Sequence, residues 1–348
     1  MHAMFDLAFF QQLVHANYEA DIRSLHPFRS SFVADTRAVC RIDLADGTAW
    51  TLRVGKANAP IPDWLVGCGA ATTPDWLRSR AATLQYLQEQ AYPAPRVIAT
   101  RSGAAIGQAN GWCTFATTFV EGQVADPTPH NLRGIAAALG RLHNIQLDQR
   151  VPASARPGQS WWFPDVAIPA VLQQYADLRQ TLPDEWHTTV DAFSATLRRI
   201  FAHDLPPAIV HGDGWAGNAV QTATNQTILI DWEPSGLGPA ILDLGRLLLH
   251  CHQTLAAPTA LPASVSQRSI AAVVDGYCQE RVPTALERAL LLDTIRFSVA
   301  FGAASHFAKA QLAQWIGPWH EKLTRRSQWY QVSETIAEIA GKRLELIL

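Results

Sequence analysis

Two neighbouring segments decide the fold of this chain: Val210-His211-Gly212-Asp213-Gly214-Trp215-Ala216-Gly217-Asn218 and Ile228-Leu229-Ile230-Asp231-Trp232-Glu233. The first segment holds three glycines, which allow the sharp backbone of a tight loop. The second is a run of aliphatic residues that ends in an acid, a pattern typical of a short strand. We therefore expect a loop followed by a hairpin that returns Asp231 to the side of Asn218.

Asp213 and Asn218 have the D-x-x-x-x-N spacing of catalytic loops that transfer a phosphoryl group. That reaction needs an acceptor for the proton of the attacking hydroxyl, and the Asp213 carboxylate can accept it. It also needs Mg²⁺, which prefers oxygen ligands and takes only one or two from protein carboxylates. We therefore expect Asp213 to be catalytic, and Asn218 and Asp231 to be metal ligands. The alternative is a β-turn between core strands in which Asp213 is only a turn former.

Several short motifs extend this pattern along the chain: His211-Gly212-Asp213, Gly217-Asn218, Ile230-Asp231-Trp232-Glu233, Gly238-Pro239 and Asp243-Leu244. On these residues the chain resembles the aminoglycoside phosphotransferase/choline kinase family, from about Ser24 to Cys251. The resemblance implies an α+β, protein-kinase-like fold with a small β-rich N-lobe and a large, mostly helical C-lobe. It also implies an active site in the cleft between the lobes.

The family resemblance implies an ATP- and Mg²⁺-dependent phosphotransferase. Its acceptor would be a hydroxyl group of a small molecule, such as an amino alcohol, a sugar-like metabolite or an antibiotic. Asp243 would support the catalytic loop by accepting backbone N–H bonds, and His211 would order the loop. We assign Trp215 and Glu233 as candidate substrate contacts.

We divide the chain into a helical extension over residues 1–23, a nucleotide-binding N-lobe over 24–120 and a C-lobe over 121–348. The N-lobe holds strand-like runs at 32–33, 38–42 and 50–54, with Asp46-Gly47 as a hairpin turn. Ser30 and Ser31 at the tip of its first hairpin are candidate phosphate contacts. The end of the strand over 112–120 resembles the linker that receives adenine, which makes Thr118, Phe119 and Val120 candidates.

Arg53 resembles the phosphate-gripping cation of the family's third strand, and Lys56 is the rival. Alternation separates Ala49, Thr51 and Arg53 from the face that carries Trp50, Leu52 and Val54. The family normally has a glutamate on the following helix that pairs with this cation. This chain has Arg80 there, inside the apolar stripe of the helix over 73–90. Arg80 would contact phosphate directly or pair with a carboxylate such as Asp231.

Helical periodicity also covers 5–16, with Phe5, Phe9 and Leu13 on one stripe, and 132–145, 190–201, 285–315 and 335–347. The segment 151–169 is rich in Pro, Ser and Trp and predicts a long loop. We expect His143 to be a hydrogen-bonded structural residue rather than a metal ligand. His250-Cys251-His252 invites a zinc interpretation, but neighbouring helical side chains diverge.

The composition of the chain limits the kinds of partner that we expect it to bind. Hydrophobic residues make up 48% of the chain and charged residues 17%, with a formal charge of −2. We therefore expect a sizeable core and neither nucleic-acid nor membrane binding. Residues 1–16 have no signal-peptide pattern, and the five cysteines are scattered. We expect a cytoplasmic protein, monomeric or homodimeric.

Two further functions stay open from the sequence. A nucleotide-binding pseudokinase is suggested by Arg80 and by the missing G-x-G-x-x-G loop, and it would bind ATP without turnover. A metal-dependent hydrolase would use His211, Asp213, Asp231 and His250 as ligands. For a kinase, we expect an acceptor with at most one or two positive charges, because no acidic cluster accompanies Glu233 and tryptophans are frequent.

Overall fold

The computed structural model describes residues 6–28, 37–58, 73–148, 167–254, 256, 261–312 and 319–347. Its contacts divide the chain into two compact units, of which the first holds the described residues up to Glu121 and the second those from Gly122 on. Ser30, Ser31, the run at 32–33 and most of the predicted loop over 151–169 lie outside the described residues.

The first unit contains an antiparallel sheet with strand order β1-β2-β3-β6-β4, in which β5 also pairs with β6. The strands are β1 (Ile22–Pro27), β2 (Arg37–Leu44), β3 (Ala49–Lys56), β4 (Val97–Ile98), β5 (Gly107–Ala109) and β6 (Trp112–Thr118). The predicted Asp46-Gly47 turn joins β2 to β3. Gly47 has φ +88° there, and the backbone N–H of Thr48 donates to Asp46 Oδ1 at 2.9 Å. This hairpin prediction is confirmed.

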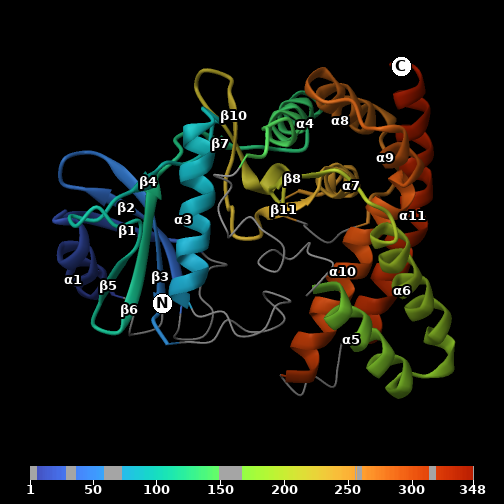
Figure 1. The fold of residues 1–348 in the computed structure, drawn as a ribbon, viewed down its shortest axis with the longest axis horizontal. Helices are drawn as coiled ribbons and strands as arrows, with labels where there is room; N and C mark the ends of the chain where they lie inside the picture. Colours follow the sequence, from blue (N-terminus) through green and yellow to red (C-terminus); the bar gives the residue numbers. More distant parts are fainter. Residues whose placement is uncertain are drawn as a thin grey trace. The chain divides into compact units, whose positions relative to one another are not determined.

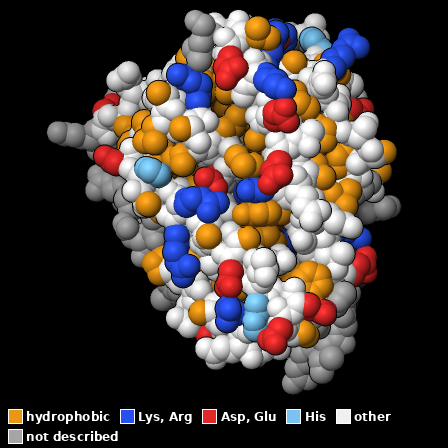
Figure 2. All heavy atoms as spheres, turned by 90° about the vertical axis from the view of Figure 1, so that its right-hand side faces the viewer, with side chains coloured by type: hydrophobic (Ala, Val, Ile, Leu, Met, Phe, Trp, Pro, Cys, Tyr) orange, Lys and Arg blue, Asp and Glu red, His pale blue; other side chains and the backbone are white. Residues whose placement is uncertain are grey.

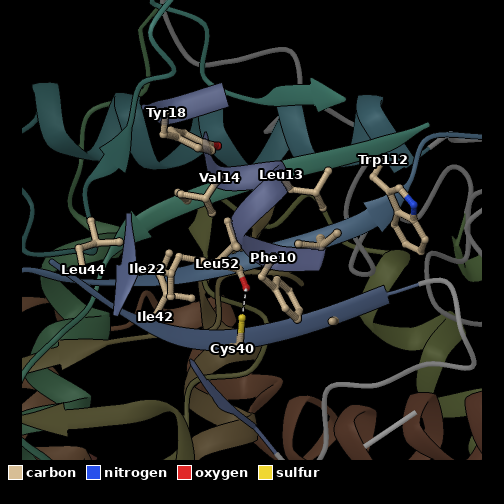
Figure 3. Packing of buried hydrophobic residues seen from close by; sticks show 13 residues of the cluster. Phe10, Leu13, Val14, Tyr18, Ile22, Cys40, Ile42, Leu44, Leu52 and Trp112 are labelled. Atoms are coloured by element: carbon tan, nitrogen blue, oxygen red, sulfur yellow. Dashed lines mark hydrogen bonds between the residues drawn. The ribbon is translucent and has the colours of Figure 1, made fainter. Parts of the chain in front are cut away.

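Helix α1 (Leu7–Tyr18) packs on one face of this sheet (Figure 3). Asp6 caps the helix by accepting a hydrogen bond from the backbone N–H of Phe9. The buried stripe includes Phe10, Leu13, Val14 and Tyr18. Of the expected Phe5–Phe9–Leu13 stripe, Leu13 is buried and Phe9 packs against the core while partly buried, whereas Phe5 lies outside the described residues.

Helix α3 (Thr73–Glu89) lies on the opposite side of the sheet from α1 (Figure 1). Arg53 pairs in register with Val39 and Phe115, on the face away from the α1 core, as the alternation predicts. Arg80 is only 3% exposed on α3, so its predicted position within the buried stripe is confirmed. Arg37 of β2 lies over the Trp76 ring of α3, 4.9 Å from its centroid.

The second unit is mainly helical. Its helices are α4 (Pro129–His143), α5 (Ala167–Thr181), α6 (His187–Phe201), α7 (Ala240–His250), α8 (Gln267–Glu280), α9 (Ala285–Ala289), α10 (Leu291–Leu312) and α11 (Trp319–Glu345), with 3₁₀ turns at Asp184–Trp186 and Ala216–Asn218. Its strands are β7 (Gln123–Val124), β8 (Pro207–Val210), β9 (Ala219–Gln221), β10 (Thr227–Leu229) and β11 (Gly236–Pro239). They form a β10-β9-β7 sheet and a β11-β8 ribbon.

Helix α7 is the buried centre of this unit, since nine of its eleven residues are buried. It packs against α10 and β8. At Gly245 a Cβ atom would lie 2.7 Å from the backbone oxygen of Thr294, so only glycine allows this approach of α7 to α10. A β-rich first unit and a helical second unit match the predicted α+β fold.

Several helices differ from their predicted bounds. The segment predicted as a loop to Pro169 already enters α5 at Ala167, and Pro169 is tolerated because it lies in the first turn. The predicted helix over 285–315 is two helices that meet at Leu290, and Thr284 and Glu287 form a capping box on the first. Helix α8 was not predicted, and α11 begins at Trp319 rather than at residue 335.

Charged residues make up much of the exposed surface of helix α11, whose buried stripe includes Leu323, Trp329, Ile336, Ala340 and Leu344. Its exposed pairs include Glu321 with Arg325 at 2.8 Å and Glu338 with Lys342 at 2.6 Å. On the face in Figure 2, acidic and basic side chains are interspersed among hydrophobic ones. None of the described helices combines the length and apolar character that a bilayer span requires.

Candidate active site

The catalytic-loop candidate follows β8 directly. Val210 of β8 pairs with Gly236 of β11, so the strand carries the chain to the loop within the buried part of the second unit. Gly212 then adopts φ +78°, a conformation that favours glycine. The 3₁₀ turn Ala216–Asn218 completes the loop. The sequence prediction of a tight, glycine-dependent loop is therefore confirmed.

Asp243 anchors this loop through hydrogen bonds to the loop backbone. Its carboxylate is fully buried in the first turn of α7 and accepts two backbone hydrogen bonds. The N–H of His211 donates to Oδ2 at 2.6 Å, and the N–H of Gly212 donates to Oδ1 at 2.9 Å. These are the bonds that the family resemblance implied. The backbone before Asp213 is thus fixed by a charged acceptor.

A chain of buried polar groups supports Asp243 in turn. His143 Nε2 lies 3.1 Å from Asp243 Oδ2, and His143 Nδ1 lies 2.8 Å from the Tyr277 hydroxyl. Arg281 donates to the same hydroxyl at 3.0 Å and forms a two-bonded pair with the buried carboxylate of Glu287. His143 is therefore the hydrogen-bonded structural residue that we expected. Tyr277, Arg281 and Glu287 were not predicted for this role, because their spacing in the sequence forms no recognisable motif.

His211 is fixed by both ring nitrogens. Its Nε2 lies 3.0 Å from the carbonyl oxygen of Ile230, and its Nδ1 accepts from the backbone N–H of Asp213 at 3.3 Å. The Trp232 ring lies 4.6 Å away between centroids. Burial lowers the pKa of His211 below its ordinary value, against the opposing charges of Asp243 and Asp213. A neutral His211 thus joins the loop to the strand that precedes Asp231.

Asn218 lies against Asp213. Its Nδ2 donates to the backbone oxygen of Asp213 at 2.9 Å and to the side-chain Oδ2 at 2.8 Å. Because the amide nitrogen makes both bonds, Oδ1 of Asn218 is turned away from Asp213. The D-x-x-x-x-N spacing therefore closes into a direct side-chain contact.

Asp231 returns to the side of Asn218, as the hairpin prediction required. The antiparallel pairing of β9 with β10 sets the register, and the backbone N–H of Ile230 donates to the carbonyl oxygen of Asn218 at 2.9 Å. Asp231 itself is exposed and has φ +61°, a conformation that acidic residues tolerate better than most. Amide and carboxylate oxygens therefore come from two adjacent segments and suit a hard cation such as Mg²⁺.

Arg246 belongs to the site, although the sequence did not predict a role for it. It lies one turn after Asp243 on α7, and its Nη2 donates to Asp213 Oδ1 in an ion pair. Burial alone would raise the pKa of Asp213, but Arg246, His250 and His211 together hold that pKa below its ordinary value. Asp213 is therefore ionised at neutral pH. The available signal was an arginine inside an otherwise apolar helix.

The candidate substrate residues lie near the same loop. Trp215 is half-buried, and its ring lies 6.2 Å from that of His250 between centroids. Glu233 is half-buried in the turn after Asp231. Among the tryptophans of the second unit with described side chains, Trp232 and Trp329 are core residues.

The residues suggested as ligands of a metal-dependent hydrolase do not form a metal site in the described part of the chain. Within the described ranges, no three His, Cys, Asp or Glu residues gather closely enough to hold a metal ion together. Both ring nitrogens of His211 contact backbone groups, of Ile230 and Asp213, and His250 Nδ1 contacts Gln253 Oε1. His252 Nε2 accepts from the backbone N–H of Ser266 at 2.8 Å, which leaves the zinc interpretation equally unsupported.

Two of the three candidate adenine contacts in the first unit donate their backbone N–H groups to other residues of the protein. The N–H of Thr118 donates to Arg96 and that of Phe119 donates to Ala49, at 2.8 and 3.0 Å. The Arg41 guanidinium lies 4.2 Å from the centre of the Phe119 ring. Of the three predicted adenine contacts, these bonds leave the backbone N–H of Val120 as the candidate donor. The roles of Arg53, Arg80, Ser30 and Ser31 stay predictions.

Comparison with known proteins assigns the family. A family model described as the phosphotransferase enzyme family matches residues 43–286, which include the whole loop and α7. A homoserine kinase from Caulobacter vibrioides is 23% identical over 242 residues, which cover 67% of this chain and 68% of that protein.

Solved kinase structures share the fold. An amicoumacin kinase in complex with AMP-PNP and Ca²⁺ superposes with a TM-score of 0.66 at 14% identity, covering 97% of this chain and 96% of that one. A choline kinase from Streptococcus pneumoniae gives a TM-score of 0.58 at 13% identity, covering 95% and 98%. The family resemblance and the protein-kinase-like α+β fold are thereby confirmed.

The Asp243→Asn variant tests the anchoring of the loop. The pKa of Asp243 is lowered in the fold by His143 and by the loop N–H groups, against the effect of burial. The ionised carboxylate therefore stabilises the protein above about pH 4, and this stabilisation is lost as the pH falls through the lowered pKa. We expect the variant to lose about 3 kcal/mol of unfolding free energy at pH 7.

Urea unfolding at a series of pH values measures this loss, and the difference between wild type and variant should shrink towards pH 3. Asp191→Asn is the control, since Asp191 forms an exposed pair with Arg179 and its loss should cost less than about 1 kcal/mol. A loss in Asp243→Asn that does not change between pH 7 and pH 3 would contradict the assignment.

Proposed function

Since the chain belongs to the phosphotransferase enzyme family, we propose that it transfers the γ-phosphoryl group of ATP, with Mg²⁺, to a hydroxyl group of a small molecule. The observation that carries the proposal is the direct contact of Asn218 with Asp213 in a loop that Asp243 anchors. The relatives named above are kinases whose names specify homoserine, amicoumacin and choline, which are small hydroxylated molecules.

Asp213 is the proposed proton acceptor. The acceptor hydroxyl donates a hydrogen bond to its carboxylate, and the hydroxyl oxygen forms a bond to the γ-phosphorus. The bond between that phosphorus and the bridging oxygen of ADP breaks, and the hydroxyl proton passes to Asp213. The lowered pKa of Asp213 keeps the carboxylate ionised, and the two hydrogen bonds from Asn218 and Arg246 keep it oriented.

Asn218 and Asp231 are the proposed metal ligands. The bonds of Asn218 Nδ2 to Asp213 fix the amide so that Oδ1 faces away from the base, which fits an oxygen-preferring cation. When bound, Mg²⁺ neutralises charge on the phosphates. The hydrogen bond between Ile230 and Asn218 keeps the two donors adjacent, because it ties the strand before Asp231 to the loop.

Arg53 and Arg80 are the proposed phosphate contacts from the first unit. Both are arginines, whose planar groups suit bidentate phosphate binding. The backbone around Val120 is the proposed adenine contact. Ser30 and Ser31 complete the set on sequence grounds. A pseudokinase, suggested by Arg80 in place of the family glutamate, would bind ATP through the same residues without turnover.

Changing Asp213 to Asn tests the proposed base. We expect phosphorylation of the acceptor to fall by about two to four orders of magnitude, because no carboxylate remains to take the proton. Nucleotide binding, measured by titration calorimetry, should change little, because Asp213 is not among the proposed nucleotide contacts. Asp177→Asn on the exposed surface of α5 is the matched control. Turnover near the wild-type rate in Asp213→Asn would remove this residue from the mechanism, and ATP binding without any turnover in wild type would favour the pseudokinase.

Changing Asp231 to Asn tests the proposed metal site. The substitution removes the anionic ligand but keeps the size of the side chain. We therefore expect the Mg²⁺ concentration for half-maximal activity to rise at least about tenfold. The measurement is initial rate against free Mg²⁺ at saturating ATP. An unchanged Mg²⁺ dependence would show that the cation is bound elsewhere.

A further inference from the structure

A group of basic residues lies on the packed helices α7 and α11, and one of them contacts Asp213. Arg246 of α7 pairs with Asp213 through Nη2, while its buried Nε has no hydrogen-bond partner among the described residues. Helix α11 packs against α7 and carries Arg326. His250, one turn after Arg246, completes the cluster next to Trp215.

Arg326 adds a second positive charge to this cluster. Within the described part of the chain, it forms no ion pair with a carboxylate. Burial lowers the pKa of Arg326 to about 10, and the charge of Arg246 contributes in the same direction, against Tyr175. Arg326 is therefore still charged at neutral pH, and it lies on the helix that packs against the one carrying Arg246.

His250 does not change this balance. Burial, together with the charges of Arg246 and Arg326, lowers the pKa of His250 to about 3, so its ring is neutral at physiological pH. The described cluster therefore holds two guanidinium groups and one carboxylate, Asp213. An uncompensated cation in a partly buried site is unfavourable, and a bound anion would balance it.

We propose that the acceptor is a hydroxy acid whose carboxylate binds between Arg246 and Arg326 while its hydroxyl reaches Asp213. This inference rests on the proposed function and specifies its substrate class. The guanidinium group of Arg246 carries several N–H donors, and Asp213 accepts from Nη2 alone, so donors remain for a second carboxylate. The acceptor's anionic group and its hydroxyl are therefore separated by a few carbon atoms.

This substrate class differs from a cationic acceptor held by tryptophan rings. The Trp215 ring lies beside that of His250, and among the described residues no other aromatic ring is paired with it. The guanidinium group of Arg246 beside Asp213, with Arg326 on the neighbouring helix, would repel an ammonium group. The site therefore favours an acceptor of net negative or zwitterionic charge over an amino alcohol.

The γ-phosphate of ATP is the other compact anion that could reach these arginines. We assign the acceptor instead, because Arg246 contacts the base and Arg326 lies on the helix packed against α7, whereas the proposed nucleotide contacts come from the first unit. An experiment can distinguish the two anions. If the arginines bind the acceptor's carboxylate, their substitution changes the selectivity for acceptors; if they bind the γ-phosphate, it changes the KM for ATP.

The test uses matched acceptor pairs that differ only in the charged group: glycerate with glycerol, 4-hydroxybutyrate with butane-1,4-diol, and homoserine with 2-aminobutane-1,4-diol. Calorimetry without ATP measures binding, and coupled ADP release measures kcat/KM. We expect wild type to prefer the acid of at least one pair by about ten- to hundredfold in both measurements, the range of hydrogen bonds to charged groups.

Arg326→Gln should reduce this preference for the acid by about tenfold or more. Arg325→Gln is the matched control, since the neighbouring Arg325 forms an exposed pair with Glu321 and should leave the preference unchanged. Equal binding of acid and alcohol in all three pairs would overturn the proposal. So would an Arg326→Gln variant whose KM for ATP rises tenfold while its acceptor preference stays.

The two proposals fail in different ways. Binding of an acid that depends on Arg326, without phosphorylation of any acceptor, would contradict the proposed function and leave the anion site standing. Phosphorylation of alcohols in preference to their acids would contradict the anion site and leave the phosphotransferase standing.

Discussion

The buried carboxylate of Asp243 is the constraint on which the site depends. It accepts the N–H groups of His211 and Gly212, so the backbone that leads to Asp213 has one position. Helix α7 carries this carboxylate in its first turn and Arg246 one turn later. One buried helix therefore fixes the loop from beneath and also pairs with the proposed base.

Because these polar contacts are buried, they contribute strongly to holding the site in one arrangement. In a medium of low dielectric constant an unpaired charge is costly, and each of the carboxylates Asp213, Asp243 and Glu287 has a partner. Asp243 is balanced by His143 and the loop N–H groups, and Glu287 by Arg281. The histidines His211 and His250 stay neutral because burial lowers their pKa values. The charge that remains near Asp213 is positive, and this favours an anionic acceptor.

The sequence predicted those parts of the site that depend on local spacing. Glycines, the Asp213–Asn218 interval and the run ending at Asp231 are all features of one short stretch, and the structure brings them together. Asp243 and His211 were assigned from the family resemblance. The buried position of Arg80 followed from helical periodicity, which needs no knowledge of its neighbours.

The sequence could not predict contacts between distant segments. Arg326 lies near Arg246 only because α11 packs against α7, and Tyr277 reaches His143 only because α8 packs against α4. Helices α5, α8 and α11 were missed or misplaced because proline in a first turn, short apolar runs and charged faces obscure the helical stripe. Tertiary packing supplies the stability that their local patterns do not reveal.

Phosphorus NMR of a reaction mixture with ATP, Mg²⁺ and the acid and alcohol acceptors tests the central claim most directly. Direct transfer to a hydroxyl predicts one new phosphate-ester resonance, coupled to the carbon-bound protons of the acceptor, for each ADP formed. Release of inorganic phosphate without an ester would contradict it, because the γ-phosphoryl group would then pass to water rather than to a hydroxyl at Asp213.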